Sequence, residues 1–220
     1  MNWKLWRAVP WIDTRSGFVG SVRENGSLLD LGSSDGSTLR HFAELRPDLL
    51  LAAADISGAP DAYPRGTDFR REDFDCDELP WADGTFDAIT CMHVVEHLAS
   101  PRRLLGESAR MLRPGGRMYI ETPSPATVAM PTVTGKAAGC VTMNFHDDPT
   151  HVRPVPVAEL DELARECGMT PVASGVSRNW LFAASYPVLR VVRPETRKRY
   201  VAQQHWIGWS AYLIAVRAEV

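Results

Sequence analysis

Apolar runs bounded by polar turns recur along the first part of the chain, at residues 28–31, 49–54, 85–90 and 117–121. The run 49–54 is unbroken, which is typical of a parallel strand buried on both faces. Helices are predicted over 102–112 and 157–167, and further strands over 170–174 and 211–217. Alternation of strands and helices in this order predicts an α/β sheet.

The first of these strands leads directly into a turn of small residues that opens a helix. Gly32 and Gly36 carry no Cβ and can adopt positive φ, so a cofactor could lie along the main chain there. The helix that follows would present unpaired N–H groups, and Asp30 would face the same crevice. The spacing differs from the dinucleotide fingerprint G-x-G-x-x-G, because Ser34 stands where a middle glycine would be expected.

Acidic residues end or follow the next two strands. Asp55 comes directly after the run 49–54, at close to the offset of about 20 residues that places an acid beside the ribose in doubly wound nucleotide folds. Asp73 follows a third segment and could accept a hydrogen bond from an adenine amino group. These positions predict a nucleoside site at the carboxyl ends of the strands.

The ordered motifs DLGSSDG, AAADIS, REDF, LPWADGTFDAIT, HVVEHL and LRPGGRMYIETP, spread over residues 27–123, make the resemblance specific. The chain resembles the class I, seven-strand methyltransferases that use S-adenosylmethionine. This resemblance implies a doubly wound, Rossmann-like seven-strand sheet, mostly parallel with an antiparallel C-terminal strand, in one domain over residues 1–220. The implied cofactor is S-adenosylmethionine, which leaves as S-adenosylhomocysteine.

Positions that match the family motifs are implied to hold that cofactor. The loop would approach its methionine part, with an acid near its amino group; the next acid would hold the ribose and its neighbour would flank the adenine. Two further residues would meet the adenine edge and face, and three would form the floor beneath the sulfonium. In that order the residues are Gly32, Ser33, Ser34 and Gly36; Asp30; Asp55 and Ile56; Asp73 and Phe74; Cys91, Met92 and His93.

Two segments lie outside this motif block. Residues 1–24 are expected to be helical, and their apolar cluster, which includes Trp3 and Trp11, either packs on the domain, which we favour, or covers the cleft. Residues 124–156 are expected to form a substrate-binding or lid insertion, with a mildly apolar cover over 125–139. Residues 180–186 favour core packing, and the basic run 190–199 favours a solvated face.

The densest polar chemistry lies in the insertion, at residues 144–154. Imidazole titrates near neutral pH, so His146 or His151 could act as a general base toward a hydroxyl, with Asp148 orienting the ring. Arg153 and Phe145 are the candidate substrate contacts. The alternatives are a loop held by its own turns and a metal site made by His146, Asp147 or Asp148, and His151; we expect no metal. A structural role is favoured for His97.

Composition narrows the possible partners. The 220 residues carry a formal net charge of −3, which argues against a nucleic-acid-binding face. Cysteines 76, 91, 140 and 167 show no C-x-x-C spacing, so we expect neither disulfide nor zinc. With no apparent signal peptide or membrane span, a cytoplasmic monomer or homodimer that acts on a small molecule is expected.

These observations predict an enzyme that methylates a hydroxyl oxygen of a sugar, or of a glycosylated or other secondary metabolite. Two alternatives remain open. One is an NAD-dependent oxidoreductase, against which the incomplete dinucleotide fingerprint speaks. The other is a non-catalytic partner that only binds S-adenosylmethionine, because a fold that binds a cofactor need not turn it over.

Overall fold

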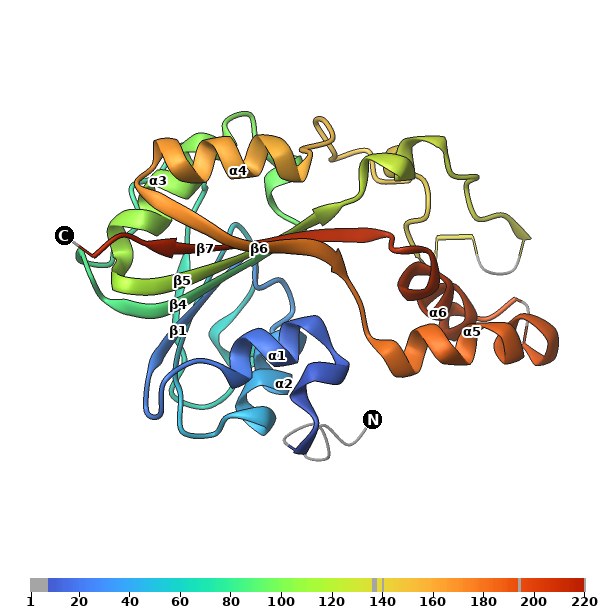
Figure 1. The fold of residues 1–220 in the computed structure, drawn as a ribbon, viewed down its shortest axis with the longest axis horizontal. Coiled ribbons are helices and arrows are strands. Elements are labelled where there is room, and N and C mark those ends of the chain that lie inside the picture. The colour runs from blue at the N-terminus through green and yellow to red at the C-terminus, as the bar shows by residue number, and fades with distance from the viewer. Residues whose placement is uncertain (1–7, 136–137, 140, 194, 220) are drawn as a thin grey trace.

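The computed structural model describes residues 8–135, 138–139, 141–193 and 195–219. Its centre is one seven-stranded sheet in the order β3-β2-β1-β4-β5-β7-β6 (Figure 1). The strands are β1 Ser27–Leu31, β2 Leu50–Asp55, β3 Asp68–Arg71, β4 Phe86–Met92, β5 Leu112–Pro123, β6 Met169–Ser177 and β7 Ser210–Arg217. Strand β7 runs antiparallel to β5 and β6, and the other neighbours pair in parallel, which confirms the predicted fold class.

Helices cover both faces of the sheet. In Figure 1, α1 (Thr14–Gly20) and α2 (Ser37–Leu45) lie below it, and α3 (Pro101–Met111) and α4 (Val157–Glu166) lie above it. Each layer closes over its own apolar cluster, one around Phe18 and Phe42 and the other around Leu104 and Leu160. Because both faces are covered, the free carboxyl ends of the parallel strands are where a ligand can approach.

A helical pair, α5 (Trp180–Val192) and α6 (Arg197–Ile207), projects beyond the sheet between β6 and β7 (Figure 1). Core packing was expected for the aromatic stretch that begins it, and this is wrong for two of its residues. Trp180 is 54% exposed and Leu181 is 56% exposed, because α5 packs mainly on α6 and leaves its outer side uncovered. No helix of the described residues is long and apolar enough to cross a membrane.

The N-terminal segment packs against the domain over the residues that the structure describes; Trp3 lies outside them. Phe18 and Val19 are buried in the lower cluster, whereas Trp11 is exposed. Asp13 caps α1 by accepting a hydrogen bond from the Ser16 amide at 2.8 Å.

Of the predicted free cysteines, those at 76, 91 and 167 are free, and Cys140 lies outside the described residues.

Candidate functional site

The loop after β1 is tightly folded, as its glycines predict. Gly32, Ser34 and Gly36 all adopt positive φ, at 76°, 49° and 71°. A Cβ on Gly32 would lie 2.1 Å from the Val94 side chain, and one on Gly36 would lie 2.7 Å from the Ala62 carbonyl. Glycine is therefore required at 32 and 36 for two reasons. The backbone adopts positive φ there, and neighbouring segments pack directly on the loop.

Asp55 connects this loop to the end of β2. Its two carboxylate oxygens accept hydrogen bonds from the Ser34 amide at 2.7 Å and the Ser57 amide at 2.8 Å. An ionised carboxylate has about four lone-pair positions, so it retains capacity for ribose hydroxyls. Ile56, beside it, is 67% exposed and offers an uncovered apolar surface for a flat ring.

Asp30 lies near the end of β1 and is buried. Burial raises its pKa to about 7, although a hydrogen bond from the Thr90 hydroxyl at 2.7 Å and the charge of Arg15 both favour the ionised form. A buried carboxyl without a close cationic partner is a suitable neighbour for a ligand ammonium group. The predicted place of Asp30 near the cofactor's amino group stays a prediction.

The other residues predicted to contact the adenine or to form the floor beneath the sulfonium differ in burial. Asp73 is half-buried and accepts a hydrogen bond from the Asp75 amide at 3.0 Å. The side chains of Phe74 and Cys91 are buried in the upper apolar cluster, so the structure gives them packing contacts, while Met92 is half-buried. Burial also raises the pKa of the Cys91 thiol well above its usual value.

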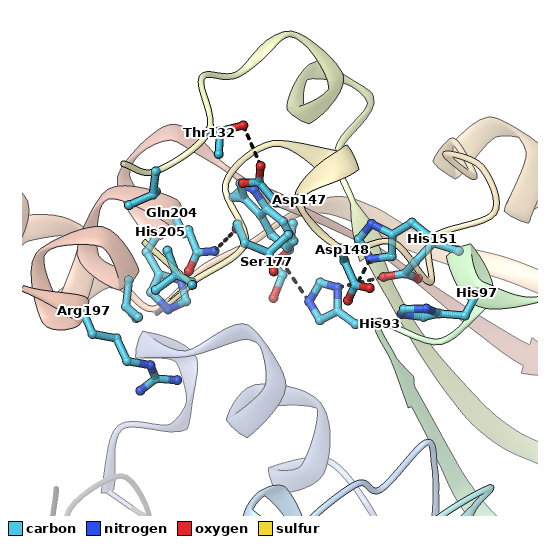
Figure 2. A pocket seen from close by; sticks show the side chains of 18 of the residues that line it. His93, His97, Thr132, Asp147, Asp148, His151, Ser177, Arg197, Gln204 and His205 are labelled. Carbon is cyan, nitrogen blue, oxygen red and sulfur yellow. Dashed lines mark hydrogen bonds and ion pairs between the residues drawn. The ribbon is translucent and has the colours of Figure 1, made fainter. Parts of the chain in front are cut away.

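A cavity of about 920 Å³ opens beside this edge (Figure 2). Its polar wall includes Arg15, His93, His97, His151 and Ser177, which come from four segments that are remote in the sequence. Neither the glycine loop nor Asp55 is among the described residues that line it. Among the residues predicted to hold the cofactor, His93 lines the cavity and thus connects it to the candidate cofactor site.

His93, one of the predicted floor residues, lies between two carboxylates. Its Nδ1 is 3.2 Å from Glu96 and its Nε2 is 3.1 Å from Glu121. Burial acts to lower the pKa of His93, but the hydrogen bonds and charges of Glu121 and Glu96 outweigh it and raise the pKa to about 9. His93 is therefore a cation at neutral pH and is not available as a base.

Glu121 is the centre of this network. Although burial favours its neutral form, Arg15 holds the pKa of Glu121 well below its usual range, with Arg15 Nε 2.8 Å from the carboxylate. Tyr119 and Ser177 each donate a hydroxyl hydrogen bond to it at 2.8 Å. Glu121 is a site residue that the sequence did not single out. It follows an apolar run as Asp55 does, so the same signal could have identified it.

The two candidate histidines of the insertion occupy different environments. His151 lines the cavity with a side chain only 5% exposed, whereas His146 is exposed and is not among the described lining residues. The 3-10 helix η7 (Phe145–Asp147) directs His146 outward after its Asn144 cap. The structure therefore supports His151 alone as a residue of the cavity.

Asp148 does not orient the His151 ring in the expected way. His151 Nδ1 donates instead to the Phe145 carbonyl at 2.5 Å, while Asp148 lies 4.0 Å from Nε2 (Figure 2). That carbonyl fixes the proton on Nδ1 when the ring is neutral and leaves Nε2 as an acceptor. Asp148 is near enough to stabilise positive charge on the ring.

Neither candidate substrate contact lines the cavity among the described residues. Phe145 is buried, and its ring packs 4.4 Å from that of His151, so it supports the cavity wall from behind. Arg153 pairs with Glu159 at 2.8 Å on the surface. An ion pair already satisfies this guanidinium, so the structure gives little support to a substrate-binding role.

Comparison with known protein families decides to which family the chain belongs. A family model described as a methyltransferase domain matches residues 4–174, which is most of the chain. The chain belongs to this methyltransferase family. Its cofactor is S-adenosylmethionine, and the folded glycine loop, the buried Asp30 carboxyl and Asp55 with exposed Ile56 beside it are residues that suit such a ligand.

Curated relatives of this methyltransferase act on different acceptors. The ubiquinone biosynthesis O-methyltransferase of Pseudomonas aeruginosa strain UCBPP-PA14 is 25% identical in an alignment of 174 positions that covers 73% of this chain and 69% of that protein. The tRNA U34 carboxymethyltransferase of Syntrophotalea carbinolica is 36% identical in an alignment of 104 positions that covers 43% of this chain and 31% of that protein.

Solved structures share the fold. A methyltransferase in complex with the Haloferax volcanii Trm112 activator aligns with a TM-score of 0.66 and 19% identity, covering 99% of this chain and 98% of that one. The Burkholderia thailandensis 1,6-didemethyltoxoflavin-N1-methyltransferase, solved with S-adenosylhomocysteine bound, aligns with a TM-score of 0.54 and 18% identity, covering 89% and 72%. At these identities the likeness shows the fold alone.

Proposed function

We propose that this methyltransferase methylates a hydroxyl oxygen of a small metabolite bound in the cavity next to its cofactor residues. The observation that carries the proposal is the cavity-facing imidazole of His151, whose Nδ1 is held by a backbone carbonyl and whose Nε2 remains able to accept a proton. The O-methyltransferase relative supports oxygen as the acceptor atom. The polar wall suits a sugar, or a glycosylated or other secondary metabolite.

The cofactor residues would act through the backbone and three carboxylates. Asp30 would pair with the amino group, the loop 32–36 would hold the methionine part, and Asp55 would bind the ribose with Ile56 against the adenine and Asp73 at its edge. When bound, S-adenosylmethionine supplies a methyl group already activated by its positively charged sulfur. Positioning the acceptor oxygen against that methyl group would then provide much of the rate acceleration.

The chain's own part in the chemistry is to hold the acceptor and take its proton. A hydroxyl is a poor nucleophile while protonated, and His151 Nε2 would receive the proton as the new bond forms. Asp148, 4.0 Å away, would stabilise the imidazolium that results. His93 already carries a proton, so it would place a positive charge in the cavity wall and help to position the acceptor.

The test compares two histidine variants with a panel of hydroxylated metabolites and methyl-labelled S-adenosylmethionine. His151→Ala is expected to lower kcat by about 10² to 10⁴, while His146→Ala stays near the wild-type rate. Calorimetry with S-adenosylhomocysteine and with NAD accompanies the kinetics, and only the former should bind. Equal rates in both folded variants, or binding of NAD, would contradict the proposal.

A further inference from the structure

We propose that Glu96, His97 and His151 form a binding site for a divalent transition-metal cation in the wall of the cavity. One ligand atom from each of these residues lies within 4.8 Å of the others. Figure 2 shows the rings of His97 and His151 next to each other and close to Asp148. The location rests on the geometry alone, whereas the part that the cation would play in methyl transfer rests on the proposed function.

Glu96 gives the first independent sign of a missing ligand. The residue is completely buried, in the 3-10 helix η4 (Val95–His97) that follows β4. His93 Nδ1 lies 3.2 Å from Oε1, but Oε2 has no hydrogen-bond partner among the described residues. A buried carboxylate oxygen is costly to leave unpaired, and a cation would satisfy it.

The histidine rings give the second sign, because both have Nδ1 occupied. His151 Nδ1 donates to the Phe145 carbonyl at 2.5 Å. The Thr150 hydroxyl donates to Asp148 at 2.6 Å, so at 2.9 Å it accepts from His97 Nδ1. Metal-binding histidines characteristically donate the other ring N–H to a carbonyl or a similar acceptor, which leaves Nε2 free as the ligand atom.

The donor set indicates the class of ion. Two imidazoles and one carboxylate suit zinc and other first-row transition cations, and a three-residue set leaves coordination positions open. Two atoms that are each about 2.1 Å from one ion can be at most about 4.2 Å apart, so the three side chains would close slightly on binding. Asp148, 4.0 Å from His151 Nε2, lies close enough to support a further ligand.

This site differs from the metal alternative that the sequence suggested. His146 is exposed and does not line the cavity among the described residues. The residues brought together are Glu96 and His97 from η4 and His151 from the insertion. The open side would face the cavity, so an acceptor hydroxyl could bind the cation, which would lower the pKa of that hydroxyl and release its proton to solvent. His151 would then be a metal ligand, and its role as a general base would apply only to the metal-free protein.

The experiment measures metal binding without any methyl transfer. The 220-residue protein, stripped with a chelator, is titrated with Co²⁺ and with Mn²⁺ by calorimetry, and the visible spectrum of bound Co²⁺ reports the ligand field. We expect one equivalent to bind to the wild type and at least about 100-fold weaker binding to His97→Ala and Glu96→Gln. His146→Ala is the matched control and should bind as the wild type does.

The outcomes separate this site from the proposed function. If the wild type binds no stoichiometric cation, or if all three folded variants bind equally, the metal site is refuted, and activity of the stripped enzyme would leave the O-methyl transfer standing. If the wild type binds the cation at these residues but methylates no hydroxyl acceptor when metal-loaded, the metal site stands and the proposed function fails. If His97→Ala does not fold, Glu96→Gln and the Co²⁺ spectrum still decide.

Discussion

Two regions of the molecule are built differently. The cofactor edge, named for its proposed ligand, is formed by residues 30–36 and 55–58. The acceptor edge, likewise named for its proposed ligand, is formed by Arg15, residues 93–97, Glu121 and residues 144–151. At the cofactor edge, the Ser34 amide contacts Asp55 over 21 positions of sequence, through backbone N–H groups. At the acceptor edge, Arg15 and Glu121 join across 106 positions, side chain to side chain. The residues of a site that is made by the main chain at strand ends can be predicted from the sequence. The residues of a site made by side chains from distant segments can be identified only once the fold is known.

The two edges also differ in charge. At the cofactor edge burial raises the pKa of Asp30 to about 7, so this carboxyl is partly protonated at neutral pH. At the acceptor edge Arg15 and Glu121 are fully ionised, and His93 carries a proton because its pKa is raised to about 9. The cofactor edge therefore keeps a carboxyl that can respond to a cationic ligand. At the acceptor edge the charges of Arg15, His93 and Glu121 are paired with one another, and Glu96 Oε2 is left without a hydrogen-bond partner among the described residues.

The largest expected effect on stability comes from breaking the acceptor edge at its centre. Glu121→Ala would leave Arg15 without its carboxylate and His93 with Glu96 alone. It should lower the free energy of unfolding by about 3 kcal/mol, because an unpaired charge in a largely buried site is strongly unfavourable. Urea unfolding at pH 7 measures this. The control is Glu159→Ala, which removes a surface pair worth less than about 1 kcal/mol. Similar small losses in both variants would show that the network contributes no more than a surface pair.

The next effect concerns the cofactor edge. Asp55→Ala should weaken binding of S-adenosylhomocysteine by about 1.5 to 3 kcal/mol, since it removes charge-assisted hydrogen bonds to the ribose and the anchor of the loop amide of Ser34. Calorimetry measures the affinity, and Asp55→Asn, which keeps one acceptor oxygen, should give an intermediate value. Unchanged affinity in a folded Asp55→Ala protein would remove this residue from the site.

Much of the fold could be predicted because apolar runs and glycine turns are local signals. The same signals placed Asp30 and Asp55 at strand ends, where the structure has them. The contact of His97 with Thr150 spans 53 positions, and no local pattern shows which residues of a polar loop will meet a given strand end. Nor does the sequence determine which of two nearby histidines faces inward, since this depends on the turn geometry of η7.

The exposed apolar side of α5 could not be predicted for a related reason. Trp180 and Leu181 have the composition of core residues, and apolar residues in a helix normally indicate a buried face. The structure places this helix beyond the sheet, where it packs mainly on α6. The burial of a given side chain thus depends on how the layers are arranged. Composition alone indicates only how often a residue of that type is buried on average.

The smallest expected effect is a pH dependence that would distinguish the two edges. Because the pKa of Asp30 is raised to about 7 in the folded protein, from a usual value of about 3.9, the folded state holds this proton more tightly than the unfolded state. Its contribution to the free energy of unfolding is therefore fully favourable below about pH 4, is lost as the pH rises, and levels off above about pH 7. Binding of a ligand ammonium beside Asp30 should release the proton, so affinity for S-adenosylhomocysteine should rise between pH 5.5 and 7, by less than tenfold per unit. Calorimetry in buffers of different ionisation enthalpy measures the proton released, and Asp30→Asn should abolish both the release and the slope. If the slope persists in that variant, the proton comes from another group, and Asp30 is not the carboxyl that responds to the ligand.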